Sequence, residues 1–234
     1  MDDAIERPHA YLLHIGKTGG SAVTYALKPY VAAGKFQLHL QHHRFVLRNV
    51  PLGAQACFFV RDPISRFISA FYSRQRKGRP LKIGKEWNPV EQVAFAKYRT
   101  PNALALDLAA TEEAARAAAE AAMRGIFHVQ TSLLDWFESE AYFLSRLTDV
   151  LFIGFQESLT RDFEQLKVKL GLPAGVRLPD DVNAHRNPEG LDKHLDDKAI
   201  AALRAWYARD YDFFRLCLQV APQVNGRGDL AKAA

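Results

Sequence analysis

The stretch Tyr11–Tyr25 constrains the fold of this chain more than any other part of the sequence. It opens with five mostly apolar residues, the length of a buried strand, and residues 21–27 then form a helical pattern that ends before Pro29. The turn Gly16–Gly20 lies between them. A strand, a glycine-containing turn and a helix start together aim backbone N–H groups at an anion, whose charge the helix dipole favours. The stretch therefore predicts an anion-binding turn.

The side chains of this turn suit a phosphate or a similar anion. Lys17 supplies a point charge, and Thr18 and Ser21 supply hydroxyl donors. Gly19 and Gly20 allow the backbone to approach the anion closely, because glycine has no Cβ atom.

Length and composition limit the class of protein. The 234 residues predict a single α/β domain over residues 1–234, with a frayed tail after about residue 222. The net charge of +5 is modest and spread along the chain, so a small anionic ligand explains it and we expect no nucleic-acid partner. The two cysteines, Cys57 and Cys217, indicate reduced thiols and a cytoplasmic protein.

Nothing in the sequence predicts insertion into a membrane. The polar N-terminus has no signal-peptide core, and no apolar run is long enough to cross a bilayer. Peripheral contact with a membrane surface stays an open alternative.

Buried strands alternate with helices along the chain. We expect further strands at Phe36–Leu40, Ala56–Val60 and Val150–Phe155, and one long last helix that carries residues 200–218. This pattern predicts a parallel sheet flanked by helices, with ligands beyond the carboxyl ends of the strands. Because Arg61 follows one strand and the anion-binding turn follows another, we expect both at the same edge, facing a ligand with two anionic ends.

Two other classes of protein fit parts of this pattern. Gly16-Lys17-Thr18 matches the end of a Walker A motif, which makes a P-loop-type nucleotide kinase the alternative enzyme. That motif needs a glycine five positions before the Gly-Lys pair, where this chain has Tyr11. A basic nucleic-acid-binding module is the alternative outside enzymes, and it would require aromatic residues interleaved with a basic stripe.

Two motifs resemble a known family. His14–Ser21 resembles the HIPKTGGTS signature of carbohydrate sulfotransferases, the group that contains the heparan-type 2-O-sulfotransferases and soluble bacterial relatives. Val60–Tyr72 resembles the second signature of that family, roughly RDPxxRxxSxYY. Weaker likeness extends to Phe152–Glu157 and to the loop that contains His185 and Arg186. The sequence departs from the family at Gly16, where a proline is usual, and in lacking the membrane anchor and disulfides of animal members.

The resemblance implies a P-loop-like sulfotransferase fold and a reaction. The sulfuryl donor would be 3′-phosphoadenosine 5′-phosphosulfate (PAPS), and the acceptor would be a hydroxyl of a carbohydrate or a glycolipid, with no metal. The first signature would bind the 5′-phosphosulfate and the second the 3′-phosphate. The donor-binding residues so implied are Lys17, Thr18, Gly19, Gly20, Ser21, Arg61, Ser69, Arg66 and Arg186. Arg66 fits a solvated or carboxylate-paired arginine equally well.

Transfer to a hydroxyl also requires a base, and histidine suits neutral pH. The family places its base in a histidine segment at this point of the chain, which favours His42, with His43 as the reserve. A metal site that combines His39 with His42 or His43 is the alternative, but it has no clear carboxylate or cysteine ligand. His14 fits a core histidine with satisfied hydrogen bonds.

The segment Arg74–Lys85 is basic and contains Gly78, Pro80 and Gly84. It predicts an exposed loop whose charges are solvated, with contact to an anionic acceptor as the alternative.

Overall fold

The computed structural model describes residues 7–80, 85–181, 183, 187–188 and 190–227. Within it the chain divides into two compact units. The sheet unit comprises Met1–Arg61, Leu133–Ala184 and Phe213–Ala234, as far as these ranges are described, and the helical unit comprises Asp62–Ser132 and His185–Asp212 with the same restriction.

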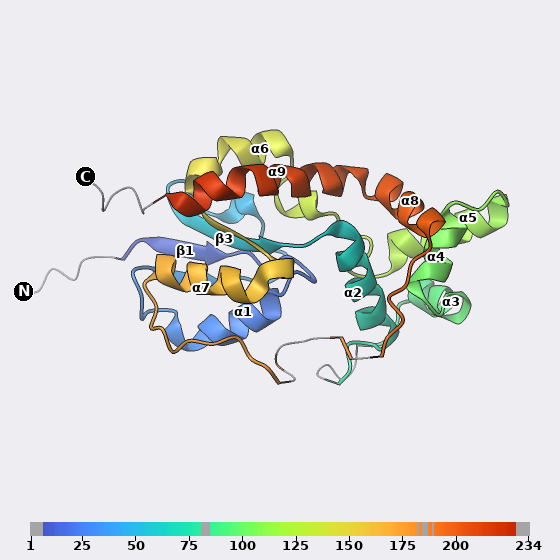
Figure 1. The fold of residues 1–234 in the computed structure, drawn as a ribbon, viewed down its shortest axis with the longest axis horizontal. Coiled ribbons are helices and arrows are strands. Elements are labelled where there is room, and N and C mark those ends of the chain that lie inside the picture. The colour runs from blue at the N-terminus through green and yellow to red at the C-terminus, as the bar shows by residue number, and fades with distance from the viewer. Residues whose placement is uncertain (1–6, 81–84, 182, 184–186, 189, 228–234) are drawn as a thin grey trace, which may run out of the picture. The chain divides into compact units, whose positions relative to one another are not determined.

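The sheet unit is built on four parallel strands in the order β2-β1-β3-β4 (Figure 1). They are β1 (His9–Leu12), β2 (Gln37–Leu40), β3 (Gln55–Val60) and β4 (Val150–Phe155). Its helices are α1 (Gly20–Leu27), α6 (Glu140–Ser145), α7 (Leu159–Leu170) and the part of α9 (Ala208–Gly226) from Phe213 onward. Short 3-10 segments lie at Lys28–Tyr30, Leu47–Asn49, Leu133–Trp136, Leu147–Asp149 and Gln156–Ser158.

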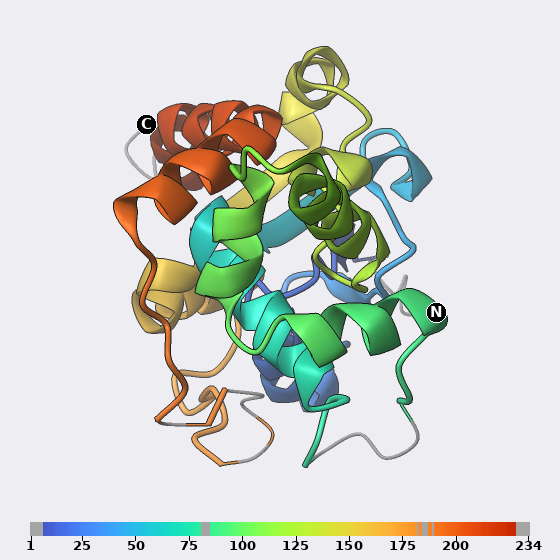
Figure 2. The same ribbon diagram turned by 90° about the vertical axis from the view of Figure 1, so that its right-hand side faces the viewer.

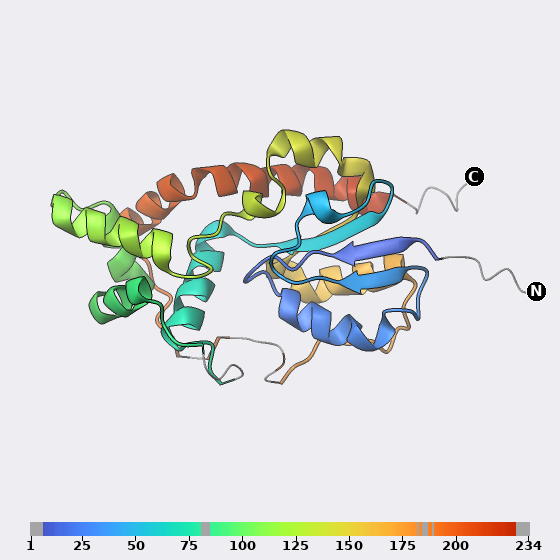
Figure 3. The same cartoon turned by 180° about the vertical axis from the view of Figure 1, so that it is seen from behind.

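Helices cover both faces of this sheet, as Figures 1 and 3 show. One face packs Cys57 and Phe59 of β3 against α1 and α7, and the other packs Phe58 against α6 and α9. A strand buried on both faces has a continuous run of apolar residues, and this run allowed β3 to be predicted from the sequence. The predicted parallel sheet flanked by helices is confirmed.

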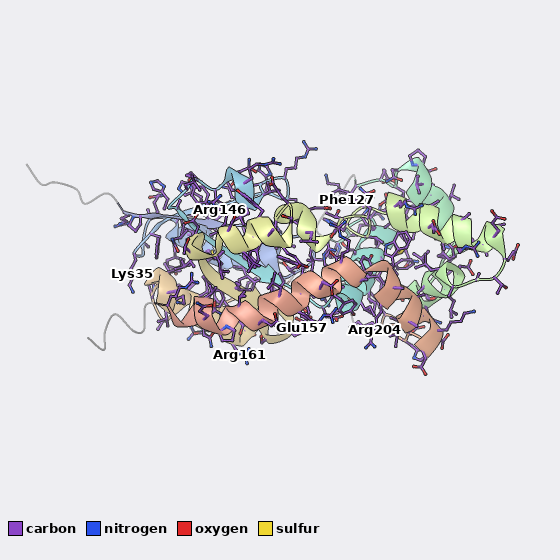
Figure 4. All side chains as sticks on the ribbon, turned by 90° about the horizontal axis from the view of Figure 1, so that it is seen from above. Lys35, Phe127, Arg146, Glu157, Arg161 and Arg204 are labelled. Carbon is purple, nitrogen blue, oxygen red and sulfur yellow. The ribbon has the colours of Figure 1, made fainter. Side chains whose placement is uncertain are left out.

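A buried arginine ties the start of β4 to the rest of the sheet unit. The Arg146 guanidinium donates to Asp149 Oδ2 at 2.7 Å, to the Tyr142 hydroxyl at 2.9 Å and to the Val50 carbonyl at 3.0 Å (Figure 4). Burial opposes the charge of Arg146, but these bonds outweigh it and raise its pKa. The hydrogen bonds of the charged Arg146 therefore hold the residues before β4 against those before β3.

The helical unit contains α2 (Pro63–Gln75), α3 (Pro89–Lys97), α4 (Pro101–Leu108), α5 (Glu113–Gly125) and α8 (Asp197–Trp206), and Figure 2 shows α3, α4 and α5 in green. Asp62 caps α2 by accepting from the Ser65 N–H at 2.8 Å, and Pro63 takes the first helical position, as the sequence predicted. Phe67 and Phe71 are buried in the core of this unit.

Three element boundaries differ from the prediction. Strand β1 ends at Leu12, so His14 and Ile15 lie in the connection to α1. The long last helix is divided at Tyr207, whose buried hydroxyl donates to the Val129 carbonyl at 3.1 Å. Helix α9 continues through Pro222 to Gly226, beyond the predicted start of the frayed tail. No helix among the described residues is long and apolar enough to cross a membrane.

The predicted exposed loop after α2 is partly wrong. Arg74 belongs to the last turn of α2, is 8% exposed and donates to both carboxylate oxygens of Glu91, which is fully buried. Glu91 also accepts from the main-chain N–H groups of Asn88 and Phe127, each at 3.0 Å. Residues 81–84 of the segment lie outside the described part of the chain.

The Arg74–Glu91 pair generates a stability prediction. Burial would raise the pKa of Glu91, but its hydrogen bonds with Arg74, Asn88 and Phe127 outweigh burial and lower it. Its ionised form should therefore stabilise the unit fully above the ordinary glutamate pKa of about 4, and this contribution should be lost as the pH falls through the lowered value. Glu91→Ala should reduce the free energy of unfolding at pH 7 by about 3–5 kcal/mol, because Arg74 would stay buried without its partner.

The control is Glu86→Ala, which removes the partner of Lys77 at a carboxylate that is 66% exposed. Exposed pairs contribute at most about 1 kcal/mol. Urea unfolding measures both variants, and equal losses would contradict a structural role for Glu91.

Candidate active site

The predicted anion-binding turn occupies residues 16–19 between β1 and α1. Two of its residues are left-handed, with φ of +70° at Lys17 and +90° at Gly19. A left-handed conformation is strained for a residue with a side chain, so Lys17 is held in place by its surroundings. Thr18 is 1% exposed and its hydroxyl donates to the Ile15 carbonyl at 3.0 Å. That hydroxyl therefore stabilises the turn.

Both glycines at the start of α1 are packed against protein side chains. A Cβ atom on Gly19 would lie 2.9 Å from Leu159 Cδ2, and one on Gly20 would lie 2.7 Å from His14 Cδ2. Leu159 is the first residue of α7. Glycine is needed at both positions for close packing, in addition to any approach of a ligand.

Arg61 lies at the same edge of the sheet as this turn. It follows β3, which pairs in parallel with β1 through Leu12 and Cys57, so the ends of both strands meet there. Arg61 Nη1 donates to the Lys17 carbonyl at 3.3 Å. The prediction that Arg61 and the turn share one edge is confirmed.

The adjacent histidines differ in their hydrogen bonds. His43 Nδ1 lies 2.9 Å from the His14 carbonyl, which only accepts, so Nδ1 carries a proton and the neutral ring keeps its lone pair on Nε2. His42 is exposed, and its Nδ1 accepts from the Arg44 N–H at 3.1 Å. In neutral His42 the ring proton is therefore on Nε2.

His14 lies beside both the turn and His43. Its ring centroid is 4.1 Å from that of His43, and its Nε2 is 3.5 Å from Ser21 Oγ. The sequence did not place His14 in the site. Its position directly before the turn was the available signal, whereas nothing in the sequence pointed to Leu159, because the contact between Leu159 and Gly19 spans 140 positions.

His39 contacts a different set of residues. Its Nε2 is 2.7 Å from His9 Nδ1, and its ring stacks on Tyr11 at 4.4 Å. Burial, and then the charge of His9, lower the pKa of His39. Among the described residues, no group of three or more His, Cys, Asp or Glu side chains could hold a metal ion.

The later residues of the second motif belong to the helical unit. Ser69 is 8% exposed and Arg66 is 2% exposed, with Arg66 Nη1 donating to the Thr131 carbonyl at 2.7 Å. The interpretation of Arg66 as a solvated arginine is therefore wrong, because polar residues of α2 are buried as well as its apolar ones. Arg186 lies outside the described residues.

Comparison with known proteins gives one match. A family model described as the sulfotransferase family matches residues 13–216. No curated protein and no solved structure matches the chain.

The left-handed backbone of Lys17 generates a prediction that separates its conformation from its charge. Lys17→Gly and Lys17→Ala both remove the ammonium group, but only glycine relieves the positive φ. Lys17→Gly should be about 1 kcal/mol more stable than Lys17→Ala in urea unfolding.

Lys28 is the matched control, because its backbone is right-handed helical with φ of −52°. There the order should reverse, with Lys28→Gly less stable than Lys28→Ala by up to about 1 kcal/mol. The same order at both positions would show that the turn does not hold Lys17 in the left-handed region.

Proposed function

The chain belongs to the sulfotransferase family, and from this premise we propose that it transfers a sulfuryl group from PAPS to a hydroxyl of a carbohydrate or glycolipid. The observation that carries the proposal is the turn between β1 and α1, with Arg61 hydrogen-bonded to it at the same edge of the sheet. The carbohydrate or glycolipid acceptor rests on the resemblance of the two motifs.

The residues of this edge fit an anionic donor. The amides of Ala22 and Val23 already donate to the Gly19 carbonyl at 3.1 and 3.2 Å, so the amides of Gly20 and Ser21 are the ones at the start of α1 that are placed to donate to a phosphate. Lys17 and Arg61 add two positive charges, and Ser21 adds a hydroxyl that is partly exposed. We assign the 5′-phosphosulfate to Lys17 and the amides of Thr18, Gly19, Gly20 and Ser21. We assign the 3′-phosphate to Arg61. Ser69, Arg66 and Arg186 are candidates that rest on the resemblance of the second motif alone.

PAPS would supply an activated sulfuryl group. In the transfer, the bond from sulfur to the phosphate oxygen breaks and a bond from sulfur to the acceptor oxygen forms, with the two oxygens in line. The residues contribute position and charge, as in phosphoryl transfer. Lys17 would stabilise the negative charge that develops on the leaving phosphate oxygen, and a histidine would take the acceptor proton.

We propose His43 as this base in preference to His42, which the sequence favoured. The hydrogen bond from His43 Nδ1 to the His14 carbonyl supports a tautomer whose Nε2 accepts a proton. The bond from the Arg44 N–H to His42 Nδ1 supports the opposite tautomer for His42. His43 also contacts His14, which lies just before the turn.

We further propose that both units form one sulfotransferase domain, because the family match spans segments of each. Cys57 and Cys217 are both buried free thiols, which supports a reducing, cytoplasmic setting.

The assignment of Arg61 is tested by binding of 3′-phosphoadenosine 5′-phosphate and adenosine 5′-phosphate in calorimetry. Arg61→Ala should weaken the first by about 2 kcal/mol, roughly 30-fold, because a charge-assisted bond is lost. The second nucleotide lacks the 3′-phosphate and should lose much less.

Arg48→Ala is the control, since Arg48 is 69% exposed and pairs with Glu138, and it should leave both affinities unchanged. Equal losses for both nucleotides in Arg61→Ala would show that Arg61 does not bind the 3′-phosphate.

The choice of base is tested by single-turnover sulfuryl transfer. His43→Ala should lower the rate about 100-fold or more, the usual contribution of a positioned general base, while donor affinity stays near that of the unmodified protein. His42→Ala should cost less than about 5-fold, because its Nε2 carries a proton. A large loss in His42→Ala alone would reverse the assignment.

A further inference from the structure

The imidazole of His43 is held by one neighbouring residue in two ways. The main-chain carbonyl of His14 accepts the proton on His43 Nδ1 at 2.9 Å. The side chain of the same residue packs against the His43 ring, with the centroids 4.1 Å apart and the planes tilted by 46°. The hydrogen bond fixes the tautomer, and the ring contact limits rotation of the imidazole about that bond.

The space for the His14 ring is provided by Gly20. A Cβ atom at residue 20 would lie 2.7 Å from His14 Cδ2, closer than real Cβ contacts, and 3.1 Å from His14 Nε2, closer than most of them. The His14 ring therefore lies against the first residue of α1, while its Nε2 lies 3.5 Å from Ser21 Oγ, a weak polar contact. Helix α1 thus forms the surface on which His14 is placed.

We propose that His14 is a positioning residue for the base His43, and that Gly20 is required because it leaves room for the His14 ring. The inference rests on the proposed function, since it assumes that His43 takes the acceptor proton. A base must reach the acceptor hydroxyl within hydrogen-bond distance, and a displacement of about 1 Å can cost 100-fold in rate. His14 and Gly20 therefore determine the position of the His43 ring without touching the reacting atoms.

A double-mutant cycle on single-turnover sulfuryl transfer tests the inference. His14→Ala should lower the rate roughly 10-fold while donor affinity is unchanged. In the His43→Ala background the same substitution should have no further effect, because His14 acts only through His43. Equal losses in both backgrounds, or no loss in the first, would overturn the role of His14.

The cycle separates failure of this inference from failure of the proposed base. If His43→Ala leaves the rate unchanged, the base assignment is wrong. If His43→Ala lowers the rate but the effects of His14→Ala and His43→Ala on the rate are additive, His43 remains the base and the positioning role of His14 is wrong.

Nitrogen NMR of the His43 ring gives a readout that needs no substrate. In the unmodified protein Nδ1 should carry the proton. His14→Ala keeps the main-chain carbonyl, so this tautomer should persist, whereas the loss of the ring contact should let the imidazole move and broaden its signals. Unchanged ring signals in His14→Ala would contradict the proposal.

Gly20→Ala provides a second variant in which His14 itself is retained. The new methyl group should displace the His14 ring, lower the transfer rate and shift the His43 signals. Gly175→Ala is its control, because no atom lies within 4 Å of a Cβ atom there. A Gly20→Ala protein with the rate and the His43 signals of the control would overturn the role given to Gly20.

Discussion

Three main-chain carbonyls just beyond the end of β1 each accept a hydrogen bond from a side chain of the candidate site. The His14 carbonyl accepts from His43, the Ile15 carbonyl from Thr18, and the Lys17 carbonyl from Arg61. Carbonyls beyond the end of a strand no longer accept hydrogen bonds from a neighbouring strand. They need other donors, because an unsatisfied buried polar group is costly. Two of these side chains, His43 and Arg61, are ones to which we assign the chemistry, and the third, Thr18, stabilises the turn. Each is oriented by the bond it makes.

This arrangement explains why the turn tolerates a strained lysine. The chain passes from strand to helix within a few residues, which requires positive φ at Lys17 and Gly19. Leu159 and His14 pack against Gly19 and Gly20 and leave no room for larger residues. The turn is therefore closely packed, which suits a reaction that depends on position and on charge stabilisation.

Local patterns in the sequence predicted much of this structure. The strands, the turn and the Asp62-Pro63 helix start follow from apolar runs, glycine and capping residues, which act over a few positions. The burial of Arg66 and the pairing of Arg74 with Glu91 depend on residues distant in the chain. The difference between the two adjacent histidines likewise depends on which backbone group each ring meets, and spacing carries no information about it.

The central claim is that the turn between β1 and α1 supports transfer of a sulfuryl group from PAPS. The most direct measurement incubates the protein with radiolabelled PAPS and extracts of glycans and lipids, beside the Lys17→Ala variant and a parallel reaction with labelled ATP and magnesium. The account predicts a labelled acceptor with PAPS and the unmodified protein, and little or no label with Lys17→Ala or with ATP. Label transferred from ATP instead of PAPS, or equal transfer by Lys17→Ala, would contradict it.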